Sequence, residues 1–297
     1  MLGVDGIVAA ALGEHQAIEQ QIILGIVIIG FGYSAGAWSN FAGSYSGAKG
    51  GIAGFRTALV AALWAYDGWN DLNMVAGEVR QPERNIPIAL ILGVATVGAL
   101  YMLVNAAVQY VLPAAAIAAS PRPASDAIGL VLGSFGASIA SAGMAICMLV
   151  TLNGTTMSGA RVPFAVARDR YFFSALAEVH PRFHTPSMAI IVQAVLAIIL
   201  LLLGGNFRQL LSLAIFAEWL FYMIAGSTIF VFRMRDPKAA RPYRVWGYPV
   251  VPVLFVIASA VPLYSAFTDN LRNSALGSLV ILAGVPVFYA FARRRQA

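Results

Sequence analysis

A short polar stretch, Trp64-Ala-Tyr-Asp-Gly-Trp-Asn-Asp71, interrupts an apolar run and carries the side chains best suited to chemistry. Its carboxyl and amide groups belong to Asp67, Asn70 and Asp71. An acid at the centre of a membrane helix costs about 2.5–3.5 kcal/mol, whereas each Leu, Ile, Phe or Val contributes only about −0.3 to −0.6 kcal/mol. We therefore expect this segment to face a protein interior or a water-filled cavity.

Gly68 lies inside this stretch, at a point where a helix can unwind and offer backbone groups to a ligand. Unwinding there is expected to leave the carbonyls of Trp64, Ala65 and Asp67 without helical partners. Such carbonyls carry partial negative charge, which suits an ammonium group. A polar membrane helix interrupted by glycine is typical of a transporter's binding site.

A purely structural interpretation of the same stretch stays open. The break could be a kink that only eases helix packing. Asp67 or Asp71 could also cap the half-helix that follows the break, since an acid near a helix N-terminus satisfies its free amides.

Three further polar side chains, Thr151, Asn153 and Thr155, lie in another apolar segment beside small residues such as Gly154 and Ser158. Hydroxyl and small residues in membrane helices commonly support close packing and hydrogen bonds between helices. Direct contact with a substrate is the alternative role.

The composition identifies an integral membrane protein. The 297 residues are 60% hydrophobic and 11% charged, and their mean hydropathy is +0.78. A soluble domain carries about 25% charged residues. The sequence therefore predicts an all-α membrane protein that passes the bilayer several times, and it excludes disordered and collagen-like classes.

Eight apolar runs are long enough to be candidate spans across about 30 Å of hydrocarbon. They fall at 21–38, 55–79, 86–112, 127–158, 186–204, 208–233, 248–267 and 274–292. The first is short for a span, and the fourth is long enough to project into water. Residues 1–20 are weakly apolar, lack a basic signal-peptide region and are assigned to no span.

Basic residues predict the orientation of these spans. Alternate connections, around 80–84, 161–182 and 233–244, together with 293–295, hold 14 of the 19 Lys and Arg residues. The positive-inside rule then places these connections and both termini in the cytoplasm. The net charge of +6 is thus an orientation signal, and nucleic acid is not expected as a partner.

No sequence pattern supports an enzyme, a cofactor or a metal site. His180 and His184 are four residues apart, but Pro181 disfavours a helix between them and no acidic or Cys ligand is nearby. Phosphate-binding loops, nucleophile elbows and dinucleotide fingerprints are missing. The single Cys147 lies in an apolar run and is expected to pack as a small apolar residue.

Three motifs resemble the L-type amino acid transporter family of the amino acid–polyamine–organocation superfamily. Residues 64–70 with 75–88 resemble its sixth helix and the following loop, 153–168 its eighth helix, and 216–233 its tenth. The resemblance covers 21–297 and implies twelve helices built on an inverted five-plus-five repeat. This chain is expected to supply helices five to twelve, with 21–38 as helix five, 55–233 as the second repeat and 248–292 as the last two helices, so the first four helices have no counterpart.

The resemblance also implies roles for individual residues. Trp64 takes the position of an aromatic gate over the substrate, and Asn70 lines the pocket. Glu218 faces the side-chain end of the pocket beside Trp219, where many relatives carry a neutral residue. Glu218 could select cationic side chains or carry a proton. Alternatively, it is an acid that only hydrogen-bonds neighbouring helices.

The resulting prediction is a plasma-membrane amino acid permease that works by alternating access, as an exchanger or a proton-linked carrier, and is shortened at its N-terminus. A sodium dependence is not supported, the coupling ion stays open, and the oligomeric state is not indicated. Two rival interpretations are a membrane scaffold subunit without transport and an ion channel.

Overall fold

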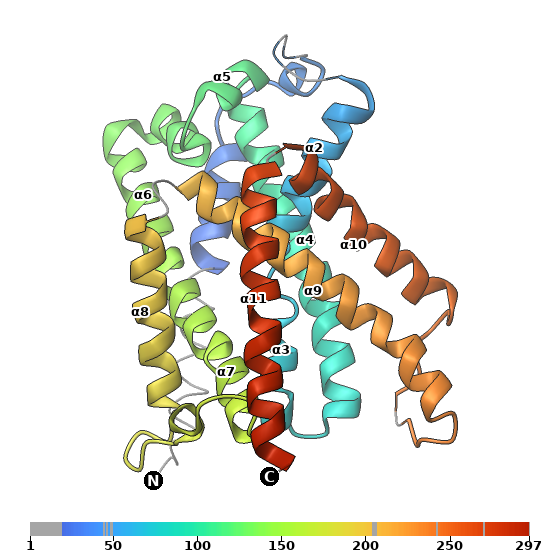
Figure 1. The fold of residues 1–297 in the computed structure, drawn as a ribbon. Coiled ribbons are helices and arrows are strands. Elements are labelled where there is room, and N and C mark those ends of the chain that lie inside the picture. Colours follow the sequence, from blue (N-terminus) through green and yellow to red (C-terminus); the bar gives the residue numbers. More distant parts are fainter. Residues whose placement is uncertain are drawn as a thin grey trace. The chain divides into compact units, whose positions relative to one another are not determined.

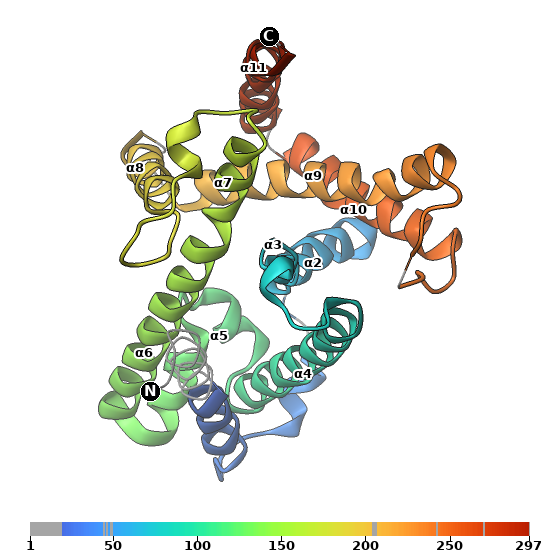
Figure 2. The ribbon, with the colours of Figure 1, turned by 90° about the horizontal axis from the view of Figure 1, so that it is seen from below.

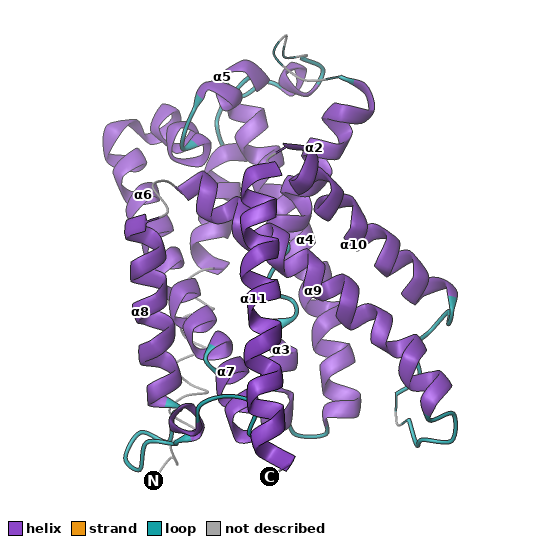
Figure 3. Ribbon diagram, in the orientation of Figure 1, coloured by secondary structure: helices purple, strands orange, loops and turns teal. Residues whose placement is uncertain are grey.

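All regular secondary structure in the described part of the chain is helical. The computed structural model describes residues 20–43, 45, 47, 50–203, 207–241, 243–269 and 271–296. Every regular element in these ranges is an α-helix or a 3-10 helix (Figures 1 and 3). The predicted all-α class is confirmed, whereas the unassigned segment 1–20 lies outside the described residues except for Gln20.

Five of the described helices are long and apolar enough to cross a membrane. They are α4 (Pro82–Val111), α6 (Pro123–Gly159), α9 (Phe207–Arg235), α10 (Val250–Asp269) and α11 (Leu271–Gln296). Three shorter apolar helices cover the other expected spans: residues 20–31, α2 (Gly51–Ala65) and α8 (Ser187–Leu203). Within the expected spans 21–38 and 55–79, these helices end at Phe31 and Ala65.

The described chain divides into two compact units. The first unit is Met1–Lys49 with Ala89–Thr155, and the second is Gly50–Ile88 with Thr156–Ala297. The chain passes between them before α2, at Gly50, and again within α4 and within α6.

The first unit is held together where the helix at residues 20–31 meets α4. Gly30 allows this approach, because a Cβ atom on it would lie 3.0 Å from the Cβ of Ala107. The chain then forms the 3-10 helix η1 (Trp38–Phe41), and Asn40 donates a side-chain hydrogen bond to the Tyr110 carbonyl at 3.1 Å. Apolar residues of α4 and α6 (Val108, Val111, Leu112 and Ala127) form its main core.

A kink inside α6 is not predicted by the sequence analysis. Gly133 has φ 73° and ψ −169°, so the helix is broken between Pro123 and Gly159. Only glycine adopts this backbone conformation without strain. The expected single span at 127–158 is therefore a short helical piece followed by a long one.

The second unit is built around α9. This helix lies side by side with α10 (Figures 1 and 2) and also contacts α11. Gly226 makes the α9–α10 contact close, since a Cβ there would approach the Phe255 ring to 2.8 Å. The Arg56 guanidinium lies 5.7 Å from the Tyr264 ring centroid and links α2 to α10.

Three shorter elements complete the second unit: α7 (Arg161–Arg168), the 3-10 helix η3 (Ser174–Ala177) and α8. They pack on a small core of Ala160, Ala167, Leu176 and Ala189.

Candidate functional site

The break in the polar stretch is present in the second unit. Helix α2 ends at Ala65, and the chain passes through turns before α3 (Asp71–Met74) and the 3-10 helix η2 (Ala76–Glu78). Gly68 adopts φ 104°, which side chains other than glycine rarely allow. The helix therefore unwinds where the sequence predicts it.

Two of the three carbonyls expected to be unpaired fit the prediction. Within the described residues, no backbone amide donates to the carbonyls of Ala65 and Asp67. The prediction for Trp64 is wrong, because its carbonyl accepts a hydrogen bond from the Asp67 amide at 3.0 Å. A tighter last turn of this kind is common where a helix ends.

A tyrosine hydroxyl joins the two acids predicted on separate helices. The Tyr222 hydroxyl lies 2.9 Å from Oδ1 of Asp67 and 2.8 Å from Oε1 of Glu218. Because a hydroxyl has one hydrogen, Tyr222 donates it to one of these oxygens or shares it between both.

The sequence analysis missed Tyr222. A hydroxyl four residues after Glu218 lies on the same face of α9, and this spacing was the available signal. The link to Asp67 could not be predicted, because it joins residues 155 positions apart.

Asp71 has a different partner, although it lies in the same short segment. The Ser158 hydroxyl donates to Oδ2 of Asp71 at 3.0 Å, and Ser158 is buried. The capping interpretation is not supported as stated, since the N-cap of α3 is Asn70 and it makes no side-chain capping bond. The Asp67 carboxylate binds Tyr222 instead of capping α3.

A pocket of about 410 Å³ lies next to these acids. It is lined by Trp69, Asn70, Asn73, Met74, Tyr222, Ala225, Gly226 and Phe255. The Trp69 ring packs 5.5 Å from the Tyr222 ring and 6.1 Å from the Phe255 ring. Asn70 lines this pocket, and its Oδ1 atom is buried and accepts no hydrogen bond from the described residues.

The two tryptophans named as site residues differ in burial. Trp219 is buried, and its ring meets the Tyr222 ring edge-on at 5.4 Å. Trp64 is half-buried in the last turn of α2, and Ala65 after it is exposed. Trp219 thus supports the tyrosine that joins the acids, whereas Trp64 is more open.

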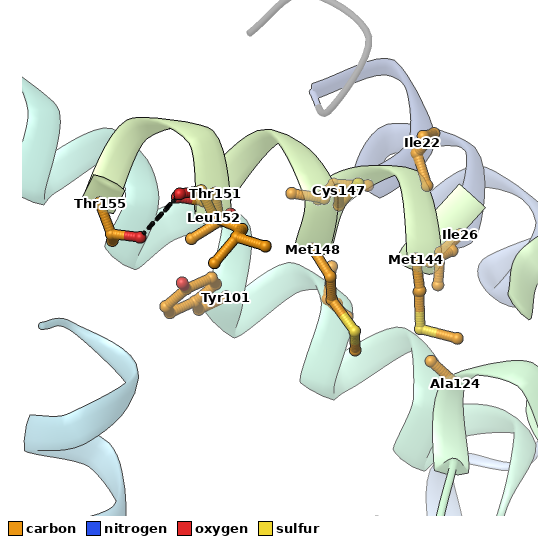
Figure 4. Close-up of a pocket in the computed structure, with 12 residues that line it drawn as sticks. Ile22, Ile26, Tyr101, Ala124, Met144, Cys147, Met148, Thr151, Leu152 and Thr155 are labelled. Carbon is orange, nitrogen blue, oxygen red and sulfur yellow. Dashed lines mark hydrogen bonds between the residues drawn. The ribbon is translucent and has the colours of Figure 1, made fainter. Parts of the chain in front are cut away.

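The predicted trio on α6 belongs to the first unit, whereas Asp67 and Glu218 belong to the second. Thr151, Asn153 and Thr155 are exposed, and the Thr155 hydroxyl donates to the Thr151 carbonyl at 3.0 Å (Figure 4). The two threonines, but not Asn153, are among the residues that line an apolar pocket of about 560 Å³. Its other walls include Ile22, Tyr101, Met144 and Cys147 (Figure 4).

The histidine pair is engaged in a turn. Nδ1 of His180 accepts hydrogen bonds from the backbone amides of Arg182 at 3.2 Å and Phe183 at 3.3 Å. Within the described ranges, no group of three His, Cys, Asp or Glu side chains is placed to hold a metal ion.

Comparison of the sequence with protein-family profiles shows to which kind of protein this site belongs. The profile of the amino acid permease family matches residues 21–291, which is nearly the whole chain. The chain belongs to the amino acid permease family. The family relationship inferred from the three motifs is confirmed, and with it a membrane protein of several spans.

Individual permeases and exchangers are similar over most of this chain. The serine/threonine exchanger SteT of Bacillus subtilis is 35% identical over 246 residues, which are 82% of this chain and 56% of SteT. The human b(0,+)-type amino acid transporter 1 is 32% identical over 279 residues, 91% of this chain and 54% of that protein. The human cystine/glutamate transporter is 29% identical over 256 residues, 86% and 50% of the two chains. This permease therefore spans about half the length of the curated relatives it matches.

Proposed function

We propose that this permease chain forms part of an amino acid carrier and that the substrate binds at the break between α2 and α3. The observation that carries the proposal is the unwound segment at Gly68 with acids gathered around it in a membrane-spanning chain. Family membership supports an amino acid as the substrate class, and the unwound segment supports the break as the proposed place of binding.

The break offers the groups that an ammonium needs. The carbonyls of Ala65 and Asp67 accept no backbone hydrogen bond from the described residues, and the carboxylate of Asp67 lies in the same turn. An ammonium group has three donors, which these oxygens can accept. Trp64, in the last turn before the break, is the proposed aromatic gate.

Glu218 gives the site an additional negative charge on α9, joined to Asp67 through Tyr222. We propose that Glu218 favours substrates with cationic side chains or carries a proton during transport. Asn70, with its buried acceptor, lines the adjoining pocket and is placed to contact part of the substrate.

The proposal extends to mechanism and location. The chain functions in the plasma membrane with both termini in the cytoplasm, by exchange or proton-linked alternating access and without enzymatic chemistry. The names of its relatives include exchangers for serine and threonine and a transporter for cystine and glutamate, so exchange is the mechanism they favour.

The test is uptake by the complete gene product in proteoliposomes, with radiolabelled L-serine, L-lysine and L-glutamate in separate experiments. We expect saturable uptake that is competed by L-amino acids and not by their D-enantiomers, and that is stronger when the vesicles are preloaded with amino acid. Ion currents that do not saturate would instead support a channel, and membrane insertion without any uptake would support a scaffold subunit.

A further inference from the structure

Another pocket, separate from the two described above, lies at the end of α9. It has a volume of about 560 Å³ and is formed by the last turns of α9 and by the loop that follows. Its charged lining residues are Arg233, Lys238, Arg241 and Arg244, and its remaining walls are one proline and two alanines. The pocket is thus cationic and has small side chains between its charges.

The loop is folded by one of these arginines. Arg241 donates hydrogen bonds to the backbone carbonyls of Asp236 at 2.6 Å, Ala239 at 2.9 Å and Pro237 at 3.2 Å. These bonds close the loop on itself and fix the pocket wall. Arg241 therefore orders the pocket, and the loop does not depend on Lys238 or Arg244 for its shape.

A second arginine is held against an aromatic ring. The Arg233 guanidinium lies 3.6 Å from the centroid of the Tyr248 ring, a stacking arrangement that favours a cation. Its Nε atom is buried and donates to no acceptor among the described residues. A buried donor of this kind is costly unless a further acceptor is supplied.

The positive charge of the pocket is not balanced by the part of the chain that is described. None of the four basic side chains makes an ion pair with a described carboxylate. Four cations around one cavity attract an anion, and the planar fork of arginine matches phosphate oxygens in pairs. The sequence around this loop adds only one acid, Asp236.

The pocket lies at one end of a membrane-spanning helix, since the candidate span of α9 is Leu213–Arg235. Two aromatic side chains near it are exposed, Tyr243 by 44% and Trp246 by 78%. Exposed Trp and Tyr side chains are enriched at the level of lipid headgroups. This position favours a phosphate group that belongs to a lipid.

We propose that this pocket binds a phosphate group, supplied by the headgroup of an anionic phospholipid. Arg233, Lys238 and Arg244 provide the charges for the phosphate oxygens, while Arg241 keeps the loop folded. Basic clusters beside membrane helices attract anionic lipids. A pocket adds selectivity for a headgroup to this general attraction.

The test is native mass spectrometry of the purified complete gene product in a neutral detergent, with equal amounts of phosphatidylglycerol and phosphatidylcholine. We expect phosphatidylglycerol to be retained preferentially. The variant Lys238→Gln/Arg244→Gln changes two exposed residues and leaves in place Arg241, which donates to the loop carbonyls; it should reduce that retention at least tenfold. The matched control, Arg168→Gln/Arg170→Gln, removes the same charge from exposed positions at the end of α7 and in the turn after it, and should retain phosphatidylglycerol normally.

A parallel arm adds inorganic phosphate at constant ionic strength and measures thermal stability. Stabilisation by phosphate that the double variant loses, without preference for phosphatidylglycerol, would overturn the lipid as the source and retain the phosphate site. Equal retention of both lipids with no effect of phosphate would overturn the proposal, and so would a double variant that behaves like the control.

Discussion

The Tyr222 hydroxyl joins two acids that lie far apart in the sequence. Its hydroxyl contacts Asp67 on the unwound segment and Glu218 one turn earlier on α9, while Trp219 supports its ring. The Tyr222 hydroxyl therefore links a carboxyl group on the unwound segment to a carboxyl group on α9.

Removing the Tyr222 hydroxyl should weaken the site without unfolding the protein. A hydrogen bond to a charged group contributes about 1.5–3 kcal/mol, so Tyr222→Phe should lower substrate affinity by about 10- to 100-fold. The measurement is the half-saturating substrate concentration in proteoliposomes. Tyr289→Phe, an exposed tyrosine on α11, is the control and should resemble the unaltered protein. An unchanged affinity in Tyr222→Phe would separate this hydroxyl from substrate binding.

Glu218 can be tested for both of its proposed roles at once. Glu218→Gln keeps the shape of the side chain and removes its charge, so lysine and arginine should compete less well for uptake. If Glu218 instead carries a proton, uptake by the unaltered protein should change as that proton is lost with rising pH, and the variant should show a flatter pH profile. Asp67, Asp71 and Tyr222 also face this region and are left in place. Should both the competition and the pH profile stay the same, Glu218 has only a structural role.

At the scale of elements, the broken helix was predictable and its surroundings were not. A glycine and two acids within an apolar run are a local signal, so the end of α2 near Gly68 follows from the sequence. The pocket beside it depends on where α9 and α10 lie, and α9 reaches α10 closely because of Gly226. Contacts between distant segments leave no local pattern, which is why the link from Tyr222 to Asp67 and the place of Phe255 in the pocket could not be predicted.

The kink in α6 could not be predicted from the local sequence either. Gly133 stands among other small residues in an apolar helix, and nothing nearby in the sequence marks it as the residue with positive φ. Glycine is equally common where membrane helices pack closely. Its conformation is therefore set by the fold and not by local preference.

Gly68 offers a direct test of the break as an element. Its φ of 104° lies in a region that alanine avoids, and strained backbone of this kind costs on the order of 1–3 kcal/mol. We expect Gly68→Ala to lower the thermal unfolding temperature in detergent and to reduce uptake. Gly77→Ala, nearby in the chain, is the control, because a Cβ there meets no atom within 4 Å and its φ is not positive. Equal unfolding temperatures for the two variants would show that the break tolerates a side chain.

At the scale of the whole molecule, the distribution of basic residues predicts how the chain crosses the membrane. The connections rich in Lys and Arg alternate with connections that hold few, and the loop after α9 is among the basic ones. The chain spans about half the length of its curated relatives. Transport is therefore to be measured on the complete gene product.

Cysteine labelling can test this orientation. In a Cys147→Ala background, we expect Ala239→Cys, in the loop after α9, to react with a membrane-impermeant maleimide only after the cells are opened. Ala119→Cys, at the exposed end of α5 (Ala114–Ala119), should react in intact cells. The reverse pattern of labelling would invert the predicted topology.

Binding of an amino acid at the break that follows Trp64 can be tested by comparing two tryptophan variants. Trp64→Ala and Trp246→Ala remove the same side chain from the last turn of α2 and from an exposed loop position. Both are measured in proteoliposomes by saturable uptake of radiolabelled L-amino acids, normalised to the amount of inserted protein. We expect Trp64→Ala to abolish saturable uptake and Trp246→Ala to retain it. Near-normal uptake by a well-inserted Trp64→Ala variant would contradict the proposed site.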